Sequence, residues 1–251
     1  MTYSIVARDP ATGQLGIAAA SRFFAVGSLV PHIRGESCAV ATQAFVNPLW
    51  GLEAAERMTA GEVAPDIIAD LVARDGGQAQ RQAHMIDGEG RQAVHTGADC
   101  IDWCGHVIGD GVSVAGNMLV GEKVITDTLA AFQAHPELAF AERLMTAMEA
   151  GEAAGGDKRG KQSAALRIHR SEDFPWLDLR ADDHPDPLAE LRRLYDVAQE
   201  RYLHIAHVMP TSTNFSGLTD RAPLDAAIAA EEDRRKRDGR QSKSFATSPL
   251  V

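Results

Sequence analysis

Short apolar runs separated by turn residues fill the first forty-odd positions of the chain, and this pattern predicts strands. Runs at 3–8 and 15–21 flank a turn in which Pro10 presets φ and Gly13 permits a tight reversal. The second run is almost wholly made of small residues, which suits a strand packed closely on both faces. The same reasoning predicts further strands, at 37–46, 80–87, 91–96, 111–115, 162–170 and 176–179.

Apolar residues at helical spacing occupy the segments between these strands. Ile67, Ile68 and Leu71 lie on one face of a predicted helix at 64–74. Similar spacing predicts the other helices, at 48–59, around 125–132, around 141–148 and at 185–202. Pairs of helices thus alternate with groups of strands, whereas a doubly wound sheet would alternate single strands with single helices. The order predicts a layered α+β fold in which helices cover antiparallel sheets.

Pattern and composition also predict how the chain divides. Residues 1–209 carry the regular elements and are predicted to form one domain, for which the 251-residue chain supplies a sizeable core. Residues 210–251 contain a dense charge run and only weak apolar patterning. We expect this segment to be a C-terminal tail that is partly helical and has a disordered end.

Charge and cysteine content narrow the classes of partner. The chain has 25 basic and 35 acidic residues and a formal net charge of −10, which argues against a nucleic-acid surface because duplex binding needs clustered cations. The longest weakly polar stretch, 15–30, contains Arg22 and is shorter than the roughly 20 apolar residues of a membrane span. No basic segment precedes an apolar one at the N-terminus, and three cysteines do not make a disulfide framework. We therefore expect no membrane contact and a cytoplasmic location.

Several motifs suggest cofactors and then fail. Residues 155–161 fit G-x-x-x-x-G-K, but Gln162 stands where a phosphate-binding loop needs Ser or Thr, and the segment follows a helix and precedes a strand. His204 and His207 share a helical face without a third ligand, and Cys100 and Cys104 lack a second pair. No G-x-S-x-G nucleophile motif occurs. The sequence predicts neither a metal nor a cofactor.

The N-terminal run carries a family resemblance. Residues 1–21 begin Met-Thr-Tyr-Ser-Ile-Val-Ala-Arg-Asp-Pro and end Leu-Gly-Ile-Ala-Ala-Ala-Ser. Further matching segments follow in order, among them Ala-Gly-Asn-Met-Leu at 115–119, Ala-Ala-Gly-Gly-Asp at 153–157 and Gln-Ser-Ala-Ala-Leu at 162–166. Over about residues 1–195 the chain resembles the DUF1028 family, a group of uncharacterised bacterial proteins.

That resemblance implies a fold and a chemistry. The family is grouped with the N-terminal-nucleophile (Ntn) hydrolases, which fold as a four-layer αββα sandwich and whose proteasome-type members use an N-terminal threonine as nucleophile. Thr2 would take this role here, with its own α-amine as the base once Met1 is removed. Asn117 would donate a hydrogen bond to the oxyanion. The alternative is a strand residue with a satisfied hydroxyl at Thr2 and a structural hydrogen bond to the backbone at Asn117. The implied activity is that of an amidohydrolase on a small amide or peptide-like substrate.

Other polar residues stand at the ends or in the middle of apolar strands that would converge near Thr2. We predict that they bind substrate, and Arg22 in particular suits a substrate carboxylate. The alternative for each is a structural hydrogen bond to the backbone. These residues are Ser21, Arg22, Thr42, Gln43 and Ser163.

The chain departs from the proteasome pattern at two positions. Proteasome-like proteins place an acid before the Ser-Arg pair, where this chain has Ala20, and a Lys on the third strand, where 35–46 contains none. A catalytically inactive Ntn-like domain, acting as a small-molecule binding protein or an oligomeric scaffold, is therefore the alternative function. A homo-oligomer is expected in either case, because broad sandwich faces pair readily as symmetric assemblies.

Overall fold

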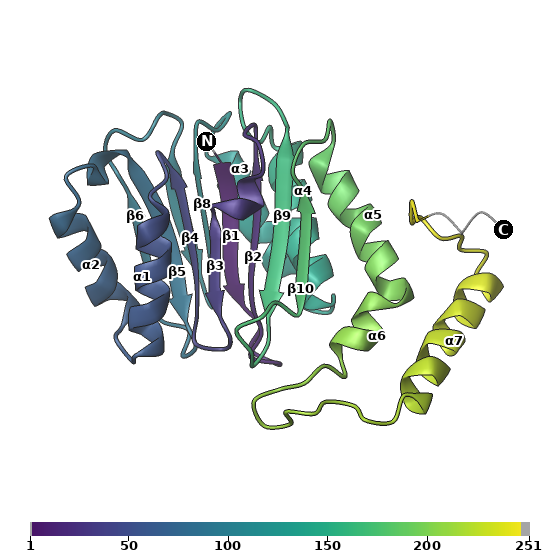
Figure 1. The fold of residues 1–251 in the computed structure, drawn as a ribbon. Coiled ribbons are helices and arrows are strands. Elements are labelled where there is room, and N and C mark those ends of the chain that lie inside the picture. The colour runs from purple at the N-terminus through teal and green to yellow at the C-terminus, as the bar shows by residue number, and fades with distance from the viewer. Residues whose placement is uncertain (1, 247–251) are drawn as a thin grey trace. The chain divides into compact units, whose positions relative to one another are not determined.

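A computed structural model describes residues 2–246, and its two antiparallel sheets confirm the α+β class. The six-stranded sheet has the order β10 (Leu177–Ala181), β9 (Ser163–His169), β2 (Leu15–Ser21), β1 (Thr2–Arg8), β8 (Val112–Asn117) and β7 (Gly105–Gly109). The four-stranded sheet has the order β3 (Pro31–Arg34), β4 (Cys38–Ala44), β5 (Arg81–Asp87) and β6 (Gln92–Thr96). Strand β1, the first element of the chain, therefore lies inside the larger sheet (Figure 1).

Helix pairs cover the outer faces of both sheets. Helices α1 (Pro48–Thr59) and α2 (Ala64–Arg74) pack on the four-stranded sheet, and α3 (Lys123–Ala134) and α4 (Phe140–Ala153) pack on the six-stranded one (Figure 1). The inner faces of the sheets contact each other through β1, β2, β4, β5 and β8. These elements form four layers in the order αββα.

Two strands, β3 and β7, were not predicted from the sequence. Both are edge strands of only four or five residues, and β7 begins and ends with glycine, which is depleted in strands. In such short segments the pairing partner, rather than the local pattern, determines the conformation. The two predicted helices at 48–59 and 64–74, by contrast, match α1 and α2 at both ends.

The chain divides into two compact units between Leu188 and Ala189, within α5 (Pro187–Glu200). The second unit contains the rest of α5, α6 (Tyr202–Ala206) and α7 (Ala222–Arg237). Within it, the buried Arg235 guanidinium binds the Asp196 and Glu200 carboxylates at 3.1 and 3.3 Å. The predicted domain boundary at 209 stays a prediction, and residues 247–251 of the predicted disordered end lie outside the described residues.

Alternation along β1 sends its side chains to two different layers. Tyr3 faces the helices, where its hydroxyl donates to the Met148 carbonyl of α4 at 2.9 Å. Val6 faces the other sheet and shares an apolar cluster with Ala39 and Ala41 of β4. Thr2 and Ser4 lie on the same face as Val6 because side chains two residues apart on a strand share a side. The beginning of β1 thus places hydroxyl groups between the sheets.

No helix within residues 2–246 is both long enough and apolar enough to cross a membrane.

Candidate functional site

A row of polar side chains crosses the six-stranded sheet where β1 begins. The strand register pairs Thr2 with Asn117 of β8 and pairs Ser21 of β2 with Ser163 of β9. The Thr2 hydroxyl donates to the Ser21 hydroxyl at 3.3 Å, which joins the two halves of the row. Four of the residues predicted from the sequence are therefore brought together by two strand registers and the hydrogen bond between them.

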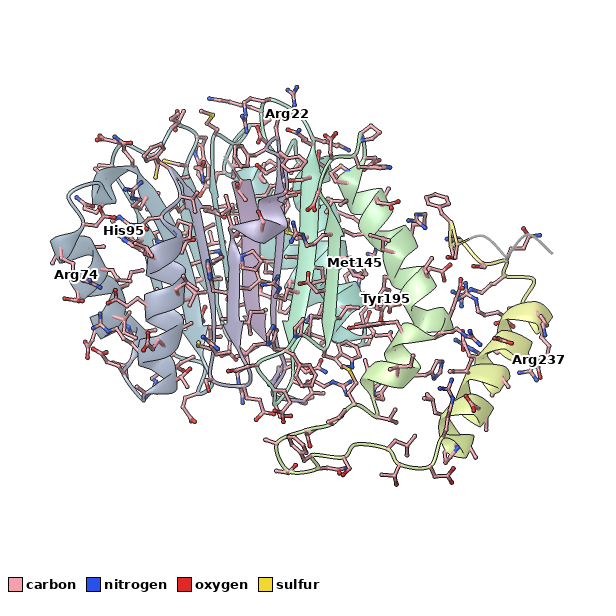
Figure 2. The ribbon with its side chains drawn as sticks, in the orientation of Figure 1. Arg22, Arg74, His95, Met145, Tyr195 and Arg237 are labelled. Atoms are coloured by element: carbon pink, nitrogen blue, oxygen red, sulfur yellow. The ribbon has the colours of Figure 1, made fainter. Side chains whose placement is uncertain are left out.

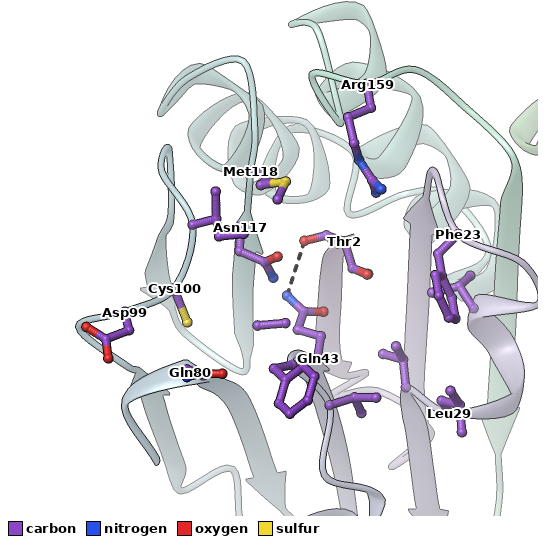
Figure 3. A pocket seen from close by; sticks show the side chains of 16 residues that line it. Thr2, Phe23, Leu29, Gln43, Gln80, Asp99, Cys100, Asn117, Met118 and Arg159 are labelled. Atoms are coloured by element: carbon purple, nitrogen blue, oxygen red, sulfur yellow. Dashed lines mark hydrogen bonds between the residues drawn. The ribbon is translucent and has the colours of Figure 1, made fainter. Parts of the chain in front are cut away.

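A cavity of about 470 Å³ opens over this row (Figure 3). Thr2, Gln43 and Asn117 form its polar floor, and Thr2 itself is only 4% exposed. Most of the remaining wall is apolar, contributed by Phe23, Val26, Leu29, Val30, Phe45, Val46, Ile101 and Met118. A few polar groups converging in an apolar concavity of this size are typical of a small-molecule site.

Two buried glutamines orient the polar floor. Gln43 donates from Nε2 to the Thr2 carbonyl at 3.4 Å (dashed in Figure 3), to the Gln82 Oε1 at 2.9 Å and to the Ala115 carbonyl at 3.2 Å. The Gln82 Oε1 also accepts from the Asn117 Nδ2 at 2.9 Å. The Gln82 Nε2 donates to the Gly116 carbonyl at 2.9 Å. Gln82 thus fixes which end of the Asn117 side chain carries the donor.

A fully buried histidine continues this network away from the cavity. His84 lies 2.8 Å from the Ser4 hydroxyl through Nε2 and 2.9 Å from the Ser113 hydroxyl through Nδ1. Ser4 donates its only proton to the Gln43 Oε1 at 2.7 Å, so His84 must donate from Nε2 and accept at Nδ1. Burial lowers the pKa of His84 to about 3, so it is neutral at physiological pH.

Backbone strain is concentrated around the same cavity. Among residues 2–246, the non-glycine residues with positive φ are Ala25 at 52°, Ala44 at 69° and Met118 at 52°. Ala44 and Met118 line the cavity, and Ala25 directly precedes the lining residue Val26. A positive φ costs free energy in a residue that carries a side chain, and such residues cluster at functional sites.

The loop between α4 and β9 supplies the cavity with an arginine. The buried Asp157 carboxylate accepts from the Arg22 backbone N–H at 2.9 Å and from the Arg159 backbone N–H at 3.0 Å. It also binds the Arg159 side chain, through Nε at 3.1 Å and Nη2 at 2.8 Å. Arg159 lines the cavity, and its side chain is directed toward it in Figure 3. Residues 155–161, which fit the phosphate-loop pattern, therefore place at the cavity an arginine, Arg159, that is paired with Asp157.

The predicted site residues divide into two groups. Thr2, Gln43 and Asn117 line the cavity, and Ser21 contacts Thr2 from beneath. The other three do not line it and make structural contacts. Arg22 is exposed at the end of the sandwich where β1 begins (Figure 2), and its guanidinium donates to the Arg159 carbonyl at 2.9 Å.

Ser163 and Thr42 act on the backbone. The Ser163 hydroxyl accepts from the Val26 N–H at 3.0 Å and donates to the Phe23 carbonyl at 2.6 Å, which holds the segment that forms one cavity wall. The Thr42 hydroxyl donates to the Leu29 carbonyl at 3.5 Å. Both contacts are of the backbone type that the sequence offered as the alternative for these residues.

Gln82, His84 and Arg159 were not predicted as site residues. Gln82 and His84 alternate with apolar residues on β5, which was a usable sign of a polar inner face. Arg159 gave no such sign, because its relation to Thr2 depends on pairing between β2 and β9.

Cysteine and metal chemistry find little support in the cavity. Cys100 lines it, but burial raises the pKa of its thiol to about 11 and the thiol donates to the Arg81 carbonyl at 3.3 Å. It is therefore a protonated, hydrogen-bonded thiol at neutral pH rather than a thiolate nucleophile. Within residues 2–246, no group of three or more His, Cys, Asp or Glu side chains is arranged to hold a metal ion.

Comparison with known proteins adds a family and a fold relative. The model of DUF1028, described as a family of unknown function, matches residues 2–191. A crystal structure of a DUF1028 protein from Silicibacter pomeroyi is 33% identical, with a TM-score of 0.81 over 87% of this chain and 96% of that one. The comparison with curated proteins found no match. These relatives support the family and the fold, and neither description states a reaction.

Proposed function

The chain belongs to the DUF1028 family, whose function is unknown, and we propose from its cavity that it is an Ntn-type amidohydrolase acting on a small amide or peptide-like substrate. The observation that carries the proposal is the position of Thr2. Thr2 lies at the floor of an apolar cavity and is paired in the strand register with Asn117 of the neighbouring strand, which lines the same cavity. A nucleophile and an oxyanion donor on adjacent strands of one largely apolar cavity are what acyl transfer requires.

Activation of the threonine needs a base close to its hydroxyl. A free α-amine on Thr2 would supply one, since its ordinary pKa of roughly 7.7–8.0 leaves much of it unprotonated near neutral pH. This role requires removal of Met1. Ser21, 3.3 Å from the Thr2 hydroxyl, can relay the proton without leaving the site.

The proposed reaction proceeds through an ester. The Thr2 Oγ1 attacks the amide carbonyl while its proton passes to the α-amine, and the negative oxygen is held by the second Nδ2–H of Asn117, which Gln82 does not take. The α-amine returns the proton to the leaving nitrogen as the C–N bond breaks. Water then hydrolyses the acyl-threonine ester to the acid and restores the hydroxyl.

One observation favours a second function. None of the described residues that line the cavity is a lysine, so the group that polarises the threonine in proteasome-type enzymes has no counterpart among them. A small-molecule binding protein with the same fold would keep the apolar pocket without needing that cation. The predicted homo-oligomer and the predicted cytoplasmic location fit both functions. Light scattering tests the oligomeric state.

The two functions are separated by kinetics on a panel of N-acyl amides. We expect Thr2→Ala to lower kcat at least about 1,000-fold and Thr2→Ser to retain part of the rate, because only the second keeps a hydroxyl. Thr213→Ala, at an exposed position in the second unit, is the matched control and should leave the rate unchanged. Binding of panel members without turnover by the wild-type protein would favour the binding protein instead.

A further inference from the structure

The cavity has a cationic side that the proposed reaction does not use. The Arg159 guanidinium is held by the buried Asp157 carboxylate, which binds its Nε and one hydrogen of Nη2. Nη1 makes no hydrogen bond within residues 2–246. Two N–H groups of Nη1 and one of Nη2 are therefore available on the side away from Asp157.

Asp157 makes this arginine a fixed group rather than a mobile surface side chain. The Asp157 side chain is only 3% exposed and also accepts from the backbone N–H groups of Arg22 and Arg159, which tie it to the residue that follows β2 and to its own loop. Gly155 and Gly156, at φ 119° and 54°, permit the turn that brings the loop back over the sheet. The fork of Arg159 is thus held in place before any ligand arrives.

The rest of the cavity wall is mostly apolar and suits an apolar portion of a ligand. Phe23 and Phe45 line it, and both remain about half exposed or more, at 53% and 69%. Large aromatic side chains that stay uncovered at a cavity mouth are suited to cover an apolar part of a ligand. A ligand that satisfies both features has an apolar portion and an anionic end.

We propose that Arg159 is a carboxylate-binding subsite and that the substrate class is N-acyl amino acids, with an apolar acyl group in the cavity and the carboxylate on Arg159. That such a compound is hydrolysed rests on the proposed function. That its carboxylate binds Arg159 rests on the cavity alone. A guanidinium with one side occupied offers parallel N–H groups to one carboxylate, which matches a bidentate contact. Asp157 offsets much of the positive charge, which disfavours a phosphate dianion.

A matched ligand pair tests this subsite by calorimetry. N-hexanoylglycine and its neutral analogue N-hexanoylglycinamide have the same shape and differ in charge. Measured on the full-length Thr2→Ala variant, which does not turn them over, the acid should bind about tenfold more tightly than the amide. The factor is modest because the Arg159 side chain is 34% exposed and water screens the contact.

Two variants assign the preference to the guanidinium. Adding Arg159→Gln should make the two affinities equal without weakening the amide, and Arg159→Lys should keep an intermediate preference because it retains charge without the fork. Arg34→Gln is the matched control. Arg34 pairs with Asp173 on the surface, so its substitution removes the same charge outside the cavity lining. It should preserve the tenfold preference.

The possible failures are distinguishable. Equal affinities in the parent protein, no binding of either compound at millimolar concentration, a preference that survives Arg159→Gln, or competition by inorganic phosphate at similar affinity would each overturn the subsite. A preserved carboxylate preference with no turnover of N-hexanoylglycine by the wild-type protein would instead overturn the proposed function and leave the subsite intact.

Discussion

At the residue scale, the direction of one hydrogen bond determines the directions of those that follow it. Ser4 has a single proton and gives it to Gln43, so neutral His84 must present Nε2–H to Ser4 and an unprotonated Nδ1 to Ser113. The Gln43 amide is thereby held with its nitrogen toward Thr2 and Gln82. A proton on the other side of His84 would therefore disturb the floor of the cavity.

This buried histidine predicts sensitivity to acid. Its pKa is about 3 in the folded state against an ordinary 6.5, so the unfolded state binds the additional proton between these pH values. The stability contributed by keeping His84 neutral is complete above pH 6.5 and is lost as the pH falls toward 3. Between pH 7 and pH 5 the loss from this group amounts to about 2 kcal/mol.

Urea unfolding of the wild type and of His84→Gln at pH 7 and pH 5 measures this contribution. The variant should lose about 2 kcal/mol less than the wild type over that interval. His169 and His32, whose pKa values burial also lowers, are present in both proteins and cancel in the difference. His135→Gln, at a side chain that is 45% exposed, is the control and should behave as the wild type does. Identical pH dependence in wild type and His84→Gln would contradict the assigned protonation state.

Asn117 is predicted to act in the transition state more than in binding. Replacement by Ala removes the Nδ2 donor and should lower kcat by about 100-fold while KM changes little, because the oxyanion exists only during reaction. Steady-state kinetics on the N-acyl amide panel provides both constants, and the thermal midpoint serves as the control for folding. A rise in KM at constant kcat would assign Asn117 to substrate binding.

At the scale of elements, helices that are specified by their local sequence pattern could be predicted, and short edge strands that are specified by pairing with a neighbouring strand could not. The helices α1 and α2 could be predicted to the residue, because each begins with proline in its first turn and repeats its apolar residues at helical spacing. The edge strands β3 and β7 could not, since each carries too few residues for a period and is specified by the strand beside it. Local pattern gives reliable elements only where they are long.

The same distinction holds for the candidate site. Thr2 and Asn117 could be predicted because their segments resemble those of a family, and the register then places them side by side. Arg159 could not be predicted because 157 positions separate it from Thr2 and its loop shows only glycine and charge. The prediction assigned carboxylate recognition to Arg22, but it is Arg159, the residue whose carbonyl Arg22 binds, that lines the cavity.

Strain at the end of β4 predicts an unusual response to glycine. Ala44 has a φ of 69°, which costs an L-residue about 1–2 kcal/mol, so Ala44→Gly should raise the free energy of unfolding by about 0.5–1 kcal/mol. The same substitution at Ala130, exposed in α3, should lower it by about 1 kcal/mol. Urea unfolding of both variants measures the two changes. Destabilisation by glycine at both positions would show that Ala44 is not strained.

At the scale of the whole molecule, the layered arrangement places the inner face of the first strand, and with it the Thr2 side chain, between the two sheets. The first strand lies inside the six-stranded sheet, where its inner face meets the second sheet, so Thr2 lies at the floor of a cavity instead of at a frayed terminus. Neighbouring strands then supply Asn117 and Ser21, and the facing sheet supplies Gln43. We propose that this arrangement makes Thr2 a nucleophile.

Mass spectrometry after treatment with a β-lactone tests this claim most directly. A nucleophilic hydroxyl opens the lactone ring and retains the whole probe as an ester, so the protein gains the full mass of the probe. We expect one adduct per chain, on a peptide that begins at Thr2 without Met1, and none in Thr2→Ala. A protein that reacts while retaining Met1, an adduct on another residue, or the absence of any adduct would contradict the account.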